Sequence, residues 1–336
     1  MSESDLLADA AARLFAQHVD PKGIEAAEQG AWPDKLWQAL TDAGMTDPLV
    51  PAELGGQGGG WVDAETIVRA AAAAAAPVPL AETIGASWLL ARAGIKPPPG
   101  PLSFAGADAR RVPWGQKAGH VVHLASAGGR QALALYAAKD LSGASDKNIA
   151  LEPRDDLILD PTKALERRPV DWPADTTRLL GALLRAVQIA GALEASVALG
   201  VRYANDRVQF GKPIGKYQAI QHQLAQLAAE AAAAKVAAGA ACRSVGADLP
   251  RFEIAVAKAR ASEAAGIGAK IVHQVHGAIG FTYEHRLQFL TRRLWSWRSE
   301  FGNAGHWQGE LGRMIAARGP EALWSDLTAR RFAAAR

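Results

Sequence analysis

A short segment around Arg207 combines residue types that suit a phosphorylated nucleotide. Arg207 carries a permanent cation, and its planar, forked guanidinium matches the geometry of a pyrophosphate. It lies near the end of a predicted helix and is followed by Phe210-Gly211, where the glycine permits a turn or a close approach of the backbone. Gln218 stands near the start of the next predicted helix, and its amide can both donate to and accept from an adenine edge. On spacing alone, the simpler interpretation is a solvated arginine and a capping glutamine.

A second segment joins a helix end to a glycine turn. Gln274 precedes the run Gly277-Ala278-Ile279-Gly280, and the missing glycine side chains would let a cofactor lie against the backbone. His276 stands beside this turn and could serve as a ligand or as an acid–base group. A lone histidine at a glycine turn is more often structural, so we expect structural roles for His276 and also for His273 and His285.

The order of helical and strand-like patterns predicts a mainly α fold with a small β domain. The predicted domains are an N-terminal helical domain at 1–101, a β domain at 102–172 and a C-terminal helical bundle domain at 173–336. Long helical patterns joined by short loops predict that the last domain is an antiparallel four-helix bundle, with helices at 176–205, 216–246, 250–277 and 285–299.

The middle domain contains short runs of alternating or apolar residues that predict strands. Residues 120–125 and 131–136 are expected to pair as a hairpin across Gly128-Gly129, and further strands are expected at 148–151 and 157–159. The zone offers about 70 residues, which suffice only for a small sheet.

The composition argues against a nucleic-acid-binding, disulfide-stabilised, zinc-binding or membrane protein. The 336 residues are 49% hydrophobic and carry a net charge of only +3, with arginines scattered along the chain, so we expect no nucleic-acid partner. The single cysteine, Cys242, excludes an intrachain disulfide and a zinc site of thiolates, and we expect no metal. The polar N-terminus lacks the features of a signal peptide, and the most apolar stretch, 179–200, is interrupted by Arg185 and Glu194. We therefore expect a cytoplasmic protein with no membrane partner.

Together with the glycine loop at 51–60, the segments at 203–214 and 273–282 resemble the acyl-CoA dehydrogenase family of flavoenzymes. The resemblance covers nearly the whole chain and includes the order of helical domain, β domain and four-helix domain. It implies FAD as the cofactor, an acyl-CoA thioester as the substrate and α,β-dehydrogenation as the reaction. It also implies a homo-oligomer or a hetero-oligomer with a related chain, and it admits an electron-transfer flavoprotein as the electron acceptor.

The resemblance also assigns cofactor-binding residues. It implies that Arg207 and Gln218 reach across a subunit interface to an FAD held by a neighbouring chain. The full set of assigned cofactor-binding residues is Arg207, Gln209, Phe210, Gln218, Gln274, Gly277 and Ala278. The family usually has paired glycines where this chain has Gly277-Ala278, so Ala278 restricts the approach of the cofactor slightly. With the motif intact, contact with a flavin cofactor is favoured over the solvated arginine.

The carboxylate base of the family is missing from both positions where the resemblance places it. The first position, in a turn downstream of Gln274, is occupied by Phe301, and Glu300 lies one residue too early. The second falls near Gly181 on the first long helix of the bundle, and residues 177–188 contain no acidic residue. Glu300 is therefore the candidate for a displaced catalytic base.

The β domain also lacks the runs with which family members hold their own flavin. The sequence thus resembles the shorter, base-lacking subunit of heteromeric bacterial members, which are associated with CoA thioesters of steroid side chains. Three hypotheses follow: a subunit that completes a partner's FAD site in fatty acid or steroid degradation, a homo-oligomeric dehydrogenase that uses Glu300 as its base, or a non-catalytic helical scaffold.

Overall fold

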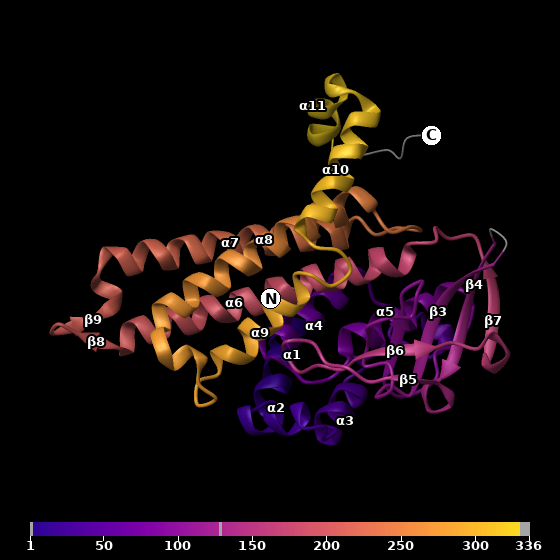
Figure 1. Ribbon diagram of the computed structural model, residues 1–336, viewed down its shortest axis with the longest axis horizontal. Helices are drawn as coiled ribbons and strands as arrows, with labels where there is room; N and C mark the ends of the chain where they lie inside the picture. The colour runs from indigo at the N-terminus through magenta and orange to yellow at the C-terminus, as the bar shows by residue number, and fades with distance from the viewer. Residues whose placement is uncertain (1–2, 128–129, 330–336) are drawn as a thin grey trace.

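The computed structural model describes residues 3–127 and 130–329 and has three zones (Figure 1). Helices form the N-terminal zone, small sheets the middle and long helices the C-terminal zone, which confirms the predicted mainly α fold with a middle β domain. The elements change from helix to strand between Arg92 and Leu102, and back to helix between Val170 and Thr176.

Five α-helices make up the N-terminal zone: α1 (Glu3–His18), α2 (Pro21–Glu28), α3 (Asp34–Asp42), α4 (Trp61–Ala73) and α5 (Leu80–Arg92). The sequence patterns had not predicted α2, although its start carries a clear signal. The Asp20 carboxylate accepts a hydrogen bond from the Gly23 amide at 2.7 Å, and Pro21 takes the first helical position. The α4 helix packs on the first helix of the bundle and α5 packs on the first strand, so this zone joins the other two.

The middle zone holds two small sheets. Its strands are β1 (Leu102–Ala105), β2 (Val112–Pro113), β3 (His120–Ala127), β4 (Arg130–Ala137), β5 (Ser142–Ala144), β6 (Arg154–Ile158) and β7 (Glu166–Val170). The order is β1-β3-β4-β7 in one sheet and β2-β6-β5 in the other, with only β1 and β3 parallel. The predicted hairpin is present as β3 and β4, while its turn, Gly128-Gly129, lies outside the described residues.

The strand predicted at 148–151 is wrong. The Asn148 side chain closes a turn there, because its amide oxygen accepts hydrogen bonds from the backbone amides of Ala150 and Glu152 at 2.9 and 3.1 Å. Asparagine's ability to bond its own backbone outweighs the apolar character of the neighbouring residues.

The C-terminal zone is a bundle of long helices. Its helices are α6 (Thr176–Asp206), α7 (Gln218–Arg243), α8 (Arg251–His276), α9 (Leu287–Trp297), α10 (Ala304–Arg318) and α11 (Pro320–Ala329). The α6, α7 and α8 helices pack along one another, and α9 packs against α6 and α8. Two-residue strands, β8 (Val208–Gln209) and β9 (Lys212–Pro213), form a hairpin between α6 and α7, and the 3-10 helix η5 (Gly277–Phe281) follows α8.

The α6 helix is long and apolar enough to cross a membrane, with a mean hydropathy of 1.5 in its most apolar window. However, 67% of that window is buried inside the protein, against α4, α7 and α8. This packing makes α6 the central helix of a folded core.

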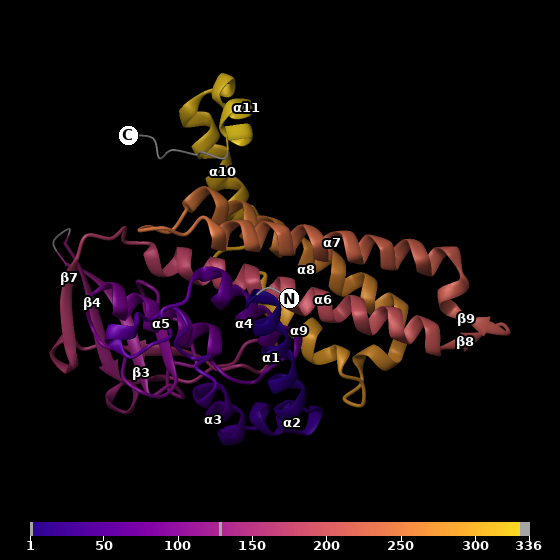
Figure 2. The ribbon, with the colours of Figure 1, turned by 180° about the vertical axis from the view of Figure 1, so that it is seen from behind.

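The sheets and the β8–β9 hairpin lie at opposite ends of the molecule (Figures 1 and 2). The α6 helix runs from the side of the sheets to the hairpin (Figures 1 and 2). The last two helices, α10 and α11, project from the body of the bundle.

Candidate functional site

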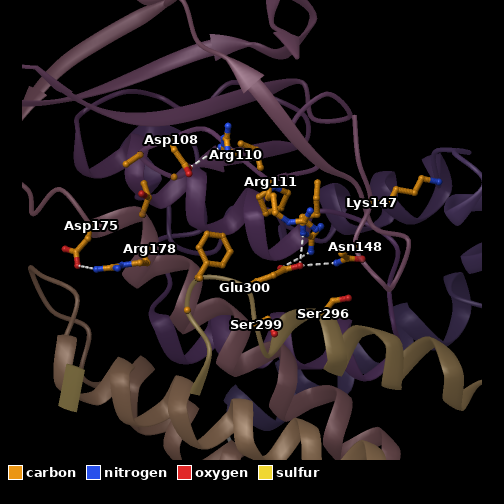
Figure 3. A pocket seen from close by; sticks show the side chains of 18 of the residues that line it. Asp108, Arg110, Arg111, Lys147, Asn148, Asp175, Arg178, Ser296, Ser299 and Glu300 are labelled. Atoms are coloured by element: carbon orange, nitrogen blue, oxygen red, sulfur yellow. Dashed lines mark hydrogen bonds and ion pairs between the residues drawn. The ribbon is translucent and has the colours of Figure 1, made fainter. Parts of the chain in front are cut away.

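A cavity of about 900 Å³ opens between the β zone and the helical bundle (Figure 3). Its wall is largely apolar, with Val112 and Pro113 from β2, Ile149, Trp295 from α9 and Phe301. The charged lining residues include Asp108, Arg110, Arg111, Lys147, Arg154, Asp175, Arg178 and Glu300. The cavity therefore suits a ligand with an apolar body and an anionic group.

Glu300 lies at this cavity and is held by two buried arginines. Its Oε1 accepts a hydrogen bond from Arg154 Nε at 2.8 Å, and its Oε2 accepts from Arg154 Nη2 at 3.0 Å and from Arg185 Nε at 2.6 Å. Asn148 Nδ2 also donates to Oε1 at 3.1 Å. The Arg154 and Arg185 side chains are 1% and 2% exposed, so their charges act across a poorly screened interior.

Two further carboxylates complete this buried ion-pair network. Glu82 of α5 accepts from Arg185 Nη2 at 2.7 Å, which ties the N-terminal zone to α6. Glu152 pairs with Arg154 at 3.0 Å and with Arg293 of α9 at 3.2 Å. The network thus links elements from all three zones behind the cavity.

This environment makes Glu300 a weak proton acceptor. Burial alone would raise its pKa, but the charges of Arg154 and Arg185, with hydrogen bonds from Arg154 and Asn148, hold the pKa far below its usual range. A general base needs a pKa near the working pH and a free lone pair directed at the substrate. Both carboxylate oxygens of Glu300 are already occupied by donors.

The two positions expected to carry a base meet in space. The Phe301 ring lies against Gly181, where an added Cβ would come within 2.3 Å of Phe301 Cδ1. Phe301 adopts a left-handed backbone with φ of 54°, and its ring also packs near Phe104 at 5.8 Å between centroids. An aromatic ring therefore occupies the space where the base is expected, and it packs against a glycine. Neither position supplies a carboxylate.

The cofactor-binding residues of the first motif lie at the far end of the bundle from this cavity. Arg207 caps α6, Gln209 and Phe210 form the β8–β9 hairpin and Gln218 starts α7 (Figure 1). All four are exposed, with the Phe210 side chain 93% exposed. Within the described ranges, 3–127 and 130–329, no ion pair involves Arg207. This end of the molecule can therefore contact a ligand held by another chain, but it faces away from the chain's own cavity.

The second motif lines a separate cavity of about 780 Å³ beside α8 and α9. Gln274 and Gly277 are part of its wall, and both are exposed, as is Ala278. Gly277 has a φ of 64° and open space where a side chain would stand, so its backbone is accessible to a ligand. Trp295 contributes to both cavities and therefore lies between them.

Sequence reasoning missed the arginines that hold Glu300. Arg185 interrupts an otherwise apolar helical stretch, and a charge on a core-facing helix position must be paired. That rule could have identified Arg185 as a buried ion-pair partner. Its partners Glu82 and Glu300 are 103 and 115 residues away, and no local pattern connects them.

The chain matches known proteins on both sides of the β zone. Residues 1–96 match the model of the acyl-CoA dehydrogenase N-terminal domain, and residues 176–304 match that of the C-terminal domain. The acyl-CoA dehydrogenase IpdE2 of Mycobacterium tuberculosis is 31% identical over 303 residues, which cover 87% of this chain and 90% of that protein. The chain therefore belongs to the acyl-CoA dehydrogenase family, oxidoreductases that act on acyl-CoA, and the resemblance drawn from the sequence is confirmed.

Solved structures share the fold. A chain of the Tcur3481-Tcur3483 steroid acyl-CoA dehydrogenase superposes with a TM-score of 0.84 at 23% identity, covering 94% of this chain and 98% of that one. A chain of the ChsE4-ChsE5 complex from Mycobacterium tuberculosis gives a TM-score of 0.84 at 21% identity, covering 95% and 99%. An acyl-CoA dehydrogenase complexed with FAD, from Bacillus anthracis, gives 0.74 at 17% identity, covering 95% and 67%.

Proposed function

We propose that this chain is the base-lacking subunit of a heteromeric, FAD-dependent acyl-CoA dehydrogenase, and that it completes an FAD site on a related partner chain. The observation that carries the proposal is the contact of Phe301 with Gly181. Both positions at which the family's base is expected meet there, and neither supplies a carboxylate. The proton acceptor for the substrate would then come from the partner chain.

The residues assigned to a neighbour's FAD fit that cofactor. Arg207 offers an exposed guanidinium with no competing ion pair in the described part of the chain, which suits a pyrophosphate. Gln218 and Gln274 offer exposed amides, and Gly277 offers open backbone. When bound, FAD supplies the hydride acceptor; the residues of this chain bind and orient it. Gln209 and Phe210, on the hairpin, extend the same exposed surface.

Glu300 has a structural role in this proposal. It neutralises Arg154 and Arg185 and so holds the 299–302 turn against the β zone and α6. The alternative, a homo-oligomer in which Glu300 is the base, would require the carboxylate to leave both arginines. Breaking a buried ion pair in this way costs about 3–5 kcal/mol.

The heteromeric state is supported by fold neighbours whose names describe two-chain assemblies, ChsE4-ChsE5 and Tcur3481-Tcur3483, the latter a steroid enzyme. We extend this to a CoA thioester of a steroid or fatty acid as the substrate class, to a cytoplasmic location and to an electron-transfer flavoprotein as the acceptor. The 900 Å³ cavity is large enough for a bulky ring system.

The proposal is tested on the complex of this chain with a related chain, to be isolated by co-purification. We expect Arg207→Ala to weaken FAD retention at least about tenfold, because a charge-assisted contact to the pyrophosphate is lost. The measurement is FAD release followed by flavin fluorescence.

Arg243→Ala is the matched control, because Arg243 is an exposed arginine at the other end of α7. It should leave FAD retention unchanged. Equal retention in the Arg207→Ala and wild-type complexes would contradict the proposed role of this chain.

A further inference from the structure

Three aromatic side chains form a stack at the end of the bundle that carries the cofactor-facing motifs. The His276 ring at the end of α8 stacks on the Tyr203 ring of α6, with 4.5 Å between centroids and 24° between planes. His285, in the loop before α9, meets His276 edge-on at 4.8 Å and Tyr203 at 6.2 Å. We call Tyr203, His276 and His285 the imidazole stack.

The hydrogen bonds of the stack fix the tautomers of its histidines. His276 Nδ1 lies 2.8 Å from the Val272 carbonyl oxygen, which can only accept, so Nδ1 carries the proton. His276 Nε2 is then a lone pair, buried and without a partner among the described residues. His285 Nδ1 accepts from the Leu287 amide at 3.2 Å and must also be unprotonated. Both rings are therefore built into the fold as neutral imidazoles.

The surroundings of the stack oppose a second proton on either ring. Burial lowers the pKa of His276, and the neighbouring His285 and His273 lower it further; burial also lowers the pKa of His285. Arg202 on α6 and Arg286 in the loop before α9 are the sequence neighbours of Tyr203 and His285, and the charge of Arg202 acts on Arg286.

The neighbours of the stack supply little negative charge that could stabilise a protonated imidazole. Glu284, the acidic residue of the same loop, is exposed to solvent. The backbone carbonyl of Ala74, the residue after α4, accepts from Arg286 Nη2 at 3.2 Å. Tyr203 contributes its ring face to His276 and its edge to His285.

The residues of the stack are connected to the end of α6, to the η5 turn and to the start of α9. The Tyr203 carbonyl accepts from the Arg207 amide at 2.9 Å, so Tyr203 forms the last turn before the hairpin. The η5 turn packs on the histidines, since an added Cβ on Gly280 would lie 3.1 Å from His276 Cβ and 3.2 Å from His273 Nδ1. His285 caps the start of α9 through Leu287.

From this geometry we infer that Tyr203, His276 and His285 are positioning residues, which hold the Arg207 and Gln274 motifs in one arrangement toward the partner's cofactor while both imidazoles are neutral. The inference deepens the proposed function and rests on it for the identity of the cofactor. Within this chain alone, the end of α6 and the η5 turn are joined through one stack, and acid disrupts both together.

The direction of the pH effect follows from the lowered pKa values. A histidine whose folded pKa lies below its ordinary value stabilises the fold at neutral pH, and that stabilisation is lost as pH falls below about 6.5. Protonated His276 would bury an N–H with no acceptor, and protonated His285 could no longer accept from the Leu287 amide.

The test is hydrogen exchange of the full chain without partner or FAD, between about pH 8 and pH 5.5 and corrected for the intrinsic pH dependence of exchange. We expect residues 203–211 and 277–287 to lose protection together in acid, by up to about tenfold per pH unit for each proton taken up on opening. The double variant His276→Asn/His285→Asn keeps a donor and an acceptor but cannot titrate. Its protection of residues 203–211 should be independent of pH in this range. Protection of residues 277–287 should depend on pH less than in the wild type, because His273, which packs beside the η5 turn, can still take up a proton.

His222→Asn is the control, because His222 is an exposed histidine on α7; it should retain the wild-type profile. If the double variant does not fold, Tyr203→Leu provides the second test and should lower protection of both segments already at neutral pH. The inference is overturned if the double variant keeps the wild-type pH dependence or if the two segments respond separately. Because no cofactor is present, this result is independent of the FAD-release test of the proposed function.

In the complex with the partner chain, FAD release should accelerate in acid for the wild type and less so for the double variant. A release rate with the same pH profile in both would contradict the positioning role.

Discussion

At the scale of single residues, the environment of Glu300 decides its role. A carboxylate bound by two guanidiniums that are almost fully buried is ionised at any physiological pH and has no free lone pair for a substrate proton. A sequence can present a glutamate next to the expected position, but only the fold shows which cations surround it.

Glu300→Gln should therefore lower stability far more than activity. Removing the negative charge leaves the buried positive charges of Arg154 and Arg185 only partly neutralised. This lowers the free energy of unfolding by about 3–5 kcal/mol. The rate per folded complex should stay within a few fold of wild type. Denaturant unfolding of the chain and turnover of the reconstituted complex measure the two effects.

Glu310→Gln serves as the control, because Glu310 forms a more exposed ion pair with Arg313 at 2.7 Å and should contribute less than about 1 kcal/mol. Since the pKa of Glu300 is lowered, its contribution should persist from neutral pH down through about pH 4.3 and disappear only in stronger acid. A loss of about 100-fold in rate with unchanged stability would instead identify Glu300 as the base.

At the scale of elements, α6 and the turn after α9 meet at one contact. Gly181 leaves room for the Phe301 ring, and an added Cβ would come within 2.3 Å of it. Alanine normally favours a helix over glycine by about 1 kcal/mol, so any destabilisation by alanine at this position must come from the clash.

Gly181→Ala should destabilise the chain by about 1–3 kcal/mol through overpacking. Phe301→Ala removes the Cγ, Cδ1 and Cε1 atoms that the added Cβ would meet. The double variant should therefore be more stable than the sum of the single changes predicts. Urea unfolding of the four proteins gives the coupling energy. Additive effects would show that the side chains at positions 181 and 301 do not compete for the same space.

The sequence predicts the long elements well and the ion-pair network poorly. The helices α6 to α9 and the β3–β4 hairpin follow from the periodic spacing of apolar residues, because this spacing shows which face of each element is buried. The α2 helix and the Asn148 turn depend on side chains that bond the local backbone. The partners of Arg185 come from α5 and from the turn after α9, so they could not be found before the chain was folded.

At the scale of the whole molecule, the chain separates two surfaces. The cavity with Phe301 and Glu300 lies between the β zone and the bundle. Arg207 and Gln218 flank the β8–β9 hairpin, which lies at the end of the molecule opposite the sheets (Figure 2). In our proposal, a cofactor that contacts Arg207 is held by the partner chain. This arrangement suits a subunit that completes an FAD site on a partner chain. The base missing from this chain would then be supplied by the partner.

Flavin content per chain tests this account most directly. We would measure the visible flavin absorbance of the well-folded chain produced alone, and of the complex that it forms with a related chain isolated by co-purification. The account predicts almost no flavin on the chain alone and about one FAD for each pair of chains in the complex, because binding needs residues from both. About one FAD on every chain produced alone would contradict this proposal. That result would favour the homo-oligomeric enzyme instead.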